Sequence, residues 1–213
     1  MPDRYPGYDV LNKRNSPSWN DATRQVIDER LALPKAPQFL SADEWQTLCA
    51  ICGRIAPQPE DRAPVPLAAM VDLKLTKDER DGYRQASLPP LREAWRRGLA
   101  ALDAAARVRH GVRFHALAAP EQDELLKAMQ NSELDGPEWG GMPARLFFRE
   151  RVTHDILAAY YSHPTAWSEI GFGGPASPRG YVRMNFNRRD PWEAVEAEPG
   201  REAAARKHNE RVG

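Results

Sequence analysis

The chain has 213 residues, and its 30 basic and 30 acidic residues cancel to a formal net charge of zero at neutral pH. A chain of this length can bury a sizeable core as one domain, but without net charge it has no overall field to attract nucleic acid or an anionic membrane. Composition therefore disfavours a nucleic-acid-binding protein, and no apolar run reaches the roughly 18 residues of a membrane span.

Residues 1–16 predict an extended N-terminal arm, because Tyr5-Pro6-Gly7-Tyr8 reads as a turn with aromatic flanks and little nearby favours a helix. This segment lacks the basic-then-apolar order of a secretory signal. We therefore expect a cytoplasmic chain, or a periplasmic one if it is exported with a partner that carries the signal.

Helical patterns separated by prolines and glycines follow the arm and predict an all-α fold. The architecture we expect is a compact irregular helical bundle of about six helices with long Pro/Gly-rich loops, spanning residues 17–184. The predicted helices run from Ser16 or Ser18 to Leu33, then over 41–55, 66–77, 90–109, 120–131 and 143–161. Ser41 and Glu44 fit a capping box, and Gly111 fits a C-cap. Residues 185–213 predict a charged tail, either a frayed helix or a disordered extension.

Residues 160–181, here called the aromatic loop, combine five aromatic rings with four glycines and three prolines. Such a segment is rigid and apolar and carries almost no reactive group, which favours a docking surface over an active site. The predicted partner-binding residues are Tyr5, Tyr8, Trp167, Phe172, Gly173, Gly174, Pro175 and Tyr181. The alternative is a cap that packs on one end of its own bundle, and both can hold together.

Cys49 and Cys52 have the C-x-x-C spacing of thiol–disulfide exchange, but they lie inside the helical pattern 41–55 with no strand before them. Buried core cysteines are the favoured interpretation. Two alternatives stay open: a redox pair in an independent thiol-redox enzyme, and half of a metal site, which would need two more soft ligands. A binding module for a small ligand is a further alternative, which a closed apolar pocket would support.

Other patterns associated with catalysis are incomplete. The glycines at 171–174 follow a helix rather than a strand and precede Pro175, so they do not fit a dinucleotide fingerprint. Glu150, His154 and Asp155 form only half of a helical metal centre. We therefore predict no catalytic residue, no metal site and no cofactor in this chain.

The C-terminal third carries a family resemblance. The helix 146–161 is followed by Pro164, then by Trp167-x-x-Ile170-Gly171-Phe172, and then by the turn Gly174-Pro175. With the layout of the preceding segments, this order resembles the gluconate 2-dehydrogenase subunit 3 family over about residues 40–182. The chain departs from the family pattern in having only Thr165-Ala166 between the proline and the tryptophan, and in lacking an export signal.

The resemblance implies a small, non-catalytic subunit of a sugar or polyol dehydrogenase complex. Its partner would be a large flavoprotein of the glucose–methanol–choline type, which carries FAD and oxidises the substrate, and a cytochrome c subunit often accepts the electrons. The small subunit would bind, stabilise and help to mature the flavoprotein.

Overall fold

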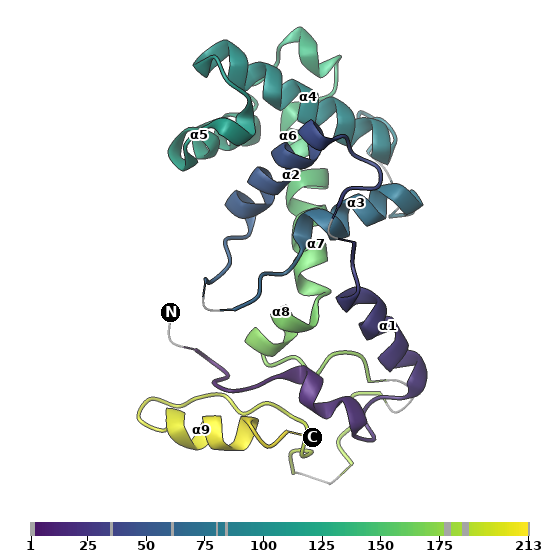
Figure 1. The fold of residues 1–213 in the computed structure, drawn as a ribbon, viewed down its shortest axis with the longest axis vertical. Helices are drawn as coiled ribbons and strands as arrows, with labels where there is room; N and C mark the ends of the chain where they lie inside the picture. The colour runs from purple at the N-terminus through teal and green to yellow at the C-terminus, as the bar shows by residue number, and fades with distance from the viewer. Residues whose placement is uncertain are drawn as a thin grey trace. The chain divides into compact units, whose positions relative to one another are not determined.

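The computed structural model describes residues 3–34, 36–60, 62–79, 81–83, 85–176, 180–184 and 188–212. These residues form helices joined by loops, with no strand among them, which confirms the all-α prediction (Figure 1). Residues 177–179 of the aromatic loop and 185–187 of the predicted tail lie outside the described residues. The chain divides into unit 1, which contains residues 1–33 and 161–213, and unit 2, which contains residues 34–160.

Unit 2 contains the predicted helices between residues 41 and 161. They are α2 (Ala42–Ile55), α3 (Leu67–Lys77), α4 (Leu91–His110), α5 (Ala119–Gln130), α6 (Ala144–Phe147) and α7 (His154–Tyr161, whose last residue begins the second segment of unit 1), with the short η2 (Phe114–Ala116) and η3 (Pro137–Trp139) and the π-helix η4 (Phe148–Thr153). The capping box of Ser41 and Glu44 and the left-handed C-cap of Gly111 are both present.

The core of unit 2 is built around α2 and α4. Helix α2 contacts α3, α4 and α5, and α4 also contacts α5, α6 and η3 (Figure 1). Trp95 meets the ring of Phe147 edge-on at a centroid distance of 5.5 Å, and Trp139 lies 6.1 Å from Phe147 on another side. All three side chains are at most 2% exposed, so these rings fix how α4 and α6 pack.

A buried carboxylate fixes the entry into α2. Asp72 of α3 is 2% exposed and accepts backbone N–H bonds from Gln38 at 2.6 Å, Phe39 at 3.2 Å and Leu40 at 2.9 Å. Three amides that would otherwise need water are thereby satisfied inside the unit. The loop before Ser41 is held against α3 in this way.

Unit 1 brings the two ends of the chain together. It contains η1 (Val10–Asn15), α1 (Asp21–Leu31), α8 (Pro164–Glu169) and α9 (Glu202–Asn209), and its core consists of Tyr8, Val10, Trp19, Ile27, Trp167, Trp192, Ala194 and Val212. The N-terminal segment runs beside the segment of α9 (Figure 1), where Asn209 donates to the carbonyl of Pro6 and Ala197 N–H to that of Arg4.

This division differs from the predicted boundaries at residues 16 and 184, because the arm and the tail supply one shared core. The described residues contain nine α-helices against about six predicted. The additional ones are α8 and α9, which are short, and the helix predicted over 143–161 is divided into α6 and α7 by η4. None of the helices in the described part of the chain is long and apolar enough to cross a membrane.

Candidate partner-binding surface

The aromatic loop contains the short helix α8, which was predicted as irregular loop. Pro164 stands at its first position, where a missing N–H costs nothing, and Nδ1 of the preceding His163 accepts the N–H of Thr165 at 3.2 Å. The indole of Trp167 donates to the carbonyl of Tyr161 at 2.7 Å, and the Arg30 guanidinium lies 5.6 Å from the Trp167 ring centroid. These contacts hold Trp167 inside unit 1.

Gly174, in the turn after α8, occupies a position where a side chain would not fit. Its φ of +66° is left-handed, and a Cβ there would come within 2.9 Å of the Trp167 ring. The close approach lets the loop fold back over the indole. Phe172 then meets Trp167 edge-on at 5.9 Å and stacks on Tyr181 at 6.1 Å.

The predicted partner-binding residues fall into three groups by exposure. Phe172 is 38% exposed and Tyr181 71% exposed, and together they form the aromatic pair of this surface. Tyr5, Gly173 and Pro175 are partly buried, whereas Tyr8, Trp167 and Gly174 are buried within unit 1. The buried group supports the surface from beneath, and only the exposed and partly buried groups are available for direct contact.

The arm that carries Tyr5 and Tyr8 packs on its own chain. The Tyr8 hydroxyl donates to the carbonyl of Trp192 at 3.3 Å, and burial raises the pKa of this phenol above its usual value. The ring of Tyr5 fills the space where a Cβ on Gly171 would stand. Neither ring extends away from unit 1, which fits the self-packing cap, and the docking surface stays a prediction.

A cleft of about 550 Å³ opens beside the aromatic pair. Phe172 and Tyr181 line it together with the cations Lys13, Arg183 and Arg189. The predictions did not include these three residues, because no local pattern links residue 13 to residues 183 and 189. The lining is charged and aromatic, which differs from the closed apolar pocket expected of a stand-alone binding module.

The cap of α8 predicts a pH dependence. Burial and the charge of Arg30 lower the pKa of His163 from 6.5, so folded His163 stays neutral where the unfolded residue takes up a proton. The free energy of unfolding should therefore decline as pH falls through 6.5 and level off below the folded pKa. Urea unfolding at a series of pH values measures this decline.

The matched variants separate His163 from the other titrating groups. In His163→Asn an uncharged amide oxygen can still cap Thr165, so the decline below pH 6.5 should be smaller than in the natural chain. His208→Asn, at an exposed position of α9, should keep the full decline. An unchanged pH dependence in His163→Asn would show that the cap does not titrate.

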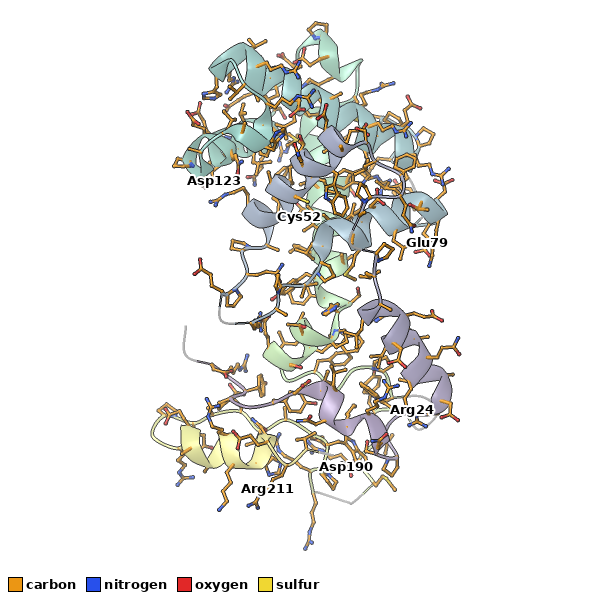
Figure 2. The ribbon with its side chains drawn as sticks, viewed as in Figure 1. Arg24, Cys52, Glu79, Asp123, Asp190 and Arg211 are labelled. Carbon is orange, nitrogen blue, oxygen red and sulfur yellow. The ribbon has the colours of Figure 1, made fainter. Side chains whose placement is uncertain are left out.

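Cys49 and Cys52 both lie within α2 but differ in exposure. Cys52, labelled in Figure 2, packs in the core of unit 2 at 5% exposure, and Cys49 lies at the surface. Burial raises the pKa of both thiols above the usual value. Neither cysteine is near the N-terminus of α2, where the helix dipole would favour a thiolate. This arrangement opposes the thiol-redox alternative.

Thiol labelling tests this conclusion. Since the thiolate is the reactive form, iodoacetamide should modify Cys49 more slowly than free glutathione at neutral pH, and Cys52 only after unfolding. Mass spectrometry of native and urea-treated protein measures both rates. Rapid modification of both cysteines in the native chain would favour the thiol-redox enzyme instead.

His154 and Asp155 approach a third metal-ligating residue, Asp81, rather than Glu150. The ligand atoms of this group lie within 4.8 Å of one another, but Lys74 Nζ stands 2.6 Å from one Asp81 oxygen and 2.8 Å from one Asp155 oxygen. Arg151 bonds the other Asp81 oxygen at 2.8 Å. A metal ion would have to displace the ammonium, so the group forms a charge network within unit 2.

A comparison with family models identifies the family of this chain. A family model described as gluconate 2-dehydrogenase subunit 3 matches residues 42–174, which is more than half of the chain and ends within the aromatic loop. No curated protein and no solved structure matches. The chain belongs to the gluconate 2-dehydrogenase subunit 3 family.

Proposed function

We propose that this chain is a non-catalytic accessory subunit that binds and stabilises an FAD-dependent dehydrogenase of the glucose–methanol–choline type. Membership of the subunit 3 family over residues 42–174 is the observation that carries the proposal. FAD is held by the partner and not by this chain. A cytochrome c subunit can join the complex as the electron acceptor.

The proposed mechanism is thermodynamic linkage. A subunit that binds only the folded flavoprotein removes it from the folding equilibrium, and at a concentration a hundredfold above Kd it stabilises the partner by about 2.7 kcal/mol. The exposed aromatic pair, Phe172 and Tyr181, supports this mechanism, because aromatic side chains are enriched among the residues that dominate binding energy. Val182 and Met184 next to them are also exposed and add apolar area.

Co-expression tests the proposal. A flavoprotein dehydrogenase of the glucose–methanol–choline type from the same genome is expressed with and without this chain, and soluble flavoprotein and bound FAD are measured. We expect both to increase when the chain is present, and the two proteins to purify together. Equal solubility and equal FAD content in both cultures would reject the accessory role.

Phe172→Ala tests this interface most directly. Loss of the Phe172 ring should weaken association with the flavoprotein by about 2 kcal/mol, or roughly thirtyfold in Kd, because the ring is the proposed anchor. Biolayer interferometry with the purified flavoprotein measures the change. The control is Val108→Ala on α4, which removes a side chain that is 86% exposed and should leave Kd unchanged.

Trp167→Ala is less informative than Phe172→Ala, because Trp167 is only 3% exposed and belongs to the core of unit 1. Its truncation would lower the stability of the unit together with any loss of binding. Circular dichroism of each variant is needed to separate the two effects. An unchanged Kd in a folded Phe172→Ala variant would exclude this ring as an anchor.

A further inference from the structure

Helix α9 and the turn after it present a basic face to solvent. The opposite side of the segment is buried in unit 1 through Ala205, Asn209 and Val212. Arg211, labelled in Figure 2, lies in the turn that follows α9. Four exposed residues have the three- and four-residue spacing of a single helix side: Ala204, Lys207, His208 and Arg211.

These four side chains and Pro191 line a shallow groove of about 330 Å³. None of the described residues that line this groove is acidic. Pro191 stands between Asp190 and Trp192, which line the cleft beside the aromatic pair. The groove therefore adjoins, within unit 1, the surface proposed to meet the partner.

The carboxylates of this segment are engaged elsewhere. Glu202 accepts a backbone N–H at 3.0 Å, and Glu210 lies 4.0 Å from Arg206. Within the described parts of the chain, neither Lys207 nor Arg211 forms an ion pair. The positive charge of the groove therefore has no acidic counterpart among the described residues.

Stabilisation of the helix end accounts for only part of this charge. The C-terminus of a helix carries a partial charge of about −0.5, which favours a nearby cation. Lys207 and Arg211 each carry a full positive charge near that end, so together they exceed what the helix dipole can balance. Excess positive charge along one exposed face is complementary to an anionic partner.

The spacing of the cations favours an extended acidic segment. Lys207 and Arg211 are four residues apart, which corresponds to about 6 Å along a helix axis at about 1.5 Å per residue. Alternate side chains of an extended chain lie on the same side, about 6.8 Å apart. Two carboxylates separated by one residue therefore match the two cations.

An anionic membrane is the less favoured partner. Helices that lie on membranes combine a basic face with large apolar side chains that enter the lipid. Helix α9 contains no large apolar residue, and Val212 after it is 3% exposed and belongs to the core of unit 1. The segment therefore has no apolar side to insert beside its cations.

We propose that the face formed by Ala204, Lys207, His208 and Arg211, here called the basic face, binds an extended acidic segment of the flavoprotein with carboxylates at alternate positions. Lys207 and Arg211 each hold one carboxylate, and the small side chain of Ala204 leaves the groove open to the backbone of the segment. This proposal rests on the proposed function and names the part of the partner that is recognised.

Removal of both charges tests the proposal. Lys207→Gln/Arg211→Gln should weaken association with the flavoprotein of the co-expression experiment at least about tenfold. The matched control, Arg107→Gln/Lys127→Gln, removes the same charge from exposed positions of α4 and α5 in unit 2 and should leave Kd unchanged. Circular dichroism checks that both variants are folded, which their exposed positions favour.

Ionic strength gives an independent measurement. At about 1 M salt the Debye length falls to about 3 Å, so exposed charges hardly attract one another. The affinities of the natural chain and of Lys207→Gln/Arg211→Gln should then converge. A difference of the same size at high salt would mean that the substitutions act through structure, and it would overturn the charge contact.

Photocrosslinking identifies the bound segment. The chain with p-benzoylphenylalanine in place of Ala204 is co-expressed with the flavoprotein, irradiated, and digested for mass spectrometry. We expect the attached segment to carry carboxylates at alternate positions, and lysines in their place to restore binding to Lys207→Glu/Arg211→Glu. Attachment to a segment without carboxylates would overturn the proposal.

The outcomes separate the two proposals. If the flavoprotein purifies with both the natural chain and Lys207→Gln/Arg211→Gln at equal affinity, the basic-face proposal is overturned and the accessory role stands. If it does not purify with the natural chain, both fail. If vesicles of phosphatidylglycerol and phosphatidylcholine bind the natural chain but not this variant, and the complex is unaffected, the basic face is a membrane contact and the peptide proposal is overturned.

Discussion

Replacing Asp155 by asparagine should lower the free energy of unfolding by about 3–5 kcal/mol, the cost of breaking a buried charge pair. The carboxylate has a fully buried side chain. It accepts from Lys74 Nζ at 2.8 Å and from the Trp95 indole at 2.8 Å, and His154 Nδ1 lies 3.2 Å away. The asparagine amide is uncharged, so the buried ion pair between Lys74 and residue 155 would be lost. Urea unfolding followed by circular dichroism measures the loss.

Asp123→Asn is the matched control for this substitution. Asp123, labelled in Figure 2, forms two hydrogen bonds with Arg54 at 2.7 and 2.6 Å, but its side chain is 36% exposed. Exposed ion pairs contribute little to stability because solvent screens them, so this variant should lose much less than Asp155→Asn. Equal losses in Asp155→Asn and Asp123→Asn would mean that burial of the network adds nothing.

The same network links the π-helix to the core of unit 2. Burial alone would lower the pKa of Lys74, but its hydrogen bonds with Asp155 and Asp81 outweigh burial and raise it above the usual value. Arg151, which bonds Asp81, belongs to η4, and Asp155 lies in the first turn of α7, which follows η4. A π-helix changes which side chains of the following turn face inward. In this chain it coincides with the burial of both Arg151 and Asp155.

Local signals predicted most of the helices of unit 2. The capping box of Ser41 and Glu44 acts over three residues, and the C-cap at Gly111 requires only one left-handed residue, so both can be recognised without knowledge of the tertiary structure. The π-helix was not predicted, because the apolar pattern of residues 143–161 is equally compatible with an uninterrupted α-helix. Helix α8 was missed, although Pro164 at its first position was an available signal.

Unit 1 could not be predicted, because its core is formed by residues nearly 200 positions apart. Tyr8 bonds Trp192, and Pro6 bonds Asn209, and no local pattern in either segment specifies the other. For the same reason, the sequence identified the aromatic loop but not the inward position of Trp167. The exposed positions of Phe172 and Tyr181, and the meeting of Lys13 with Arg189 in one cleft, required the tertiary structure.

Alanine substitutions at two helical glycines of unit 2 should have opposite effects on stability. Gly98 lies within α4, and a Cβ there would stand 2.2 Å from the ring of Phe147, which is fully buried against Trp95 and Trp139. Gly98→Ala should therefore lower the free energy of unfolding. Overpacking costs about 3 kcal/mol, at the upper end of its range, and the better helix propensity of alanine returns only about 1 kcal/mol. Gly53 lies within α2 with nothing within 4 Å of its Cβ position, so Gly53→Ala should stabilise the unit by about 0.5–1 kcal/mol. Urea unfolding of both variants gives the two signs, and a stabilising Gly98→Ala would mean that α4 and α6 are not packed through Phe147.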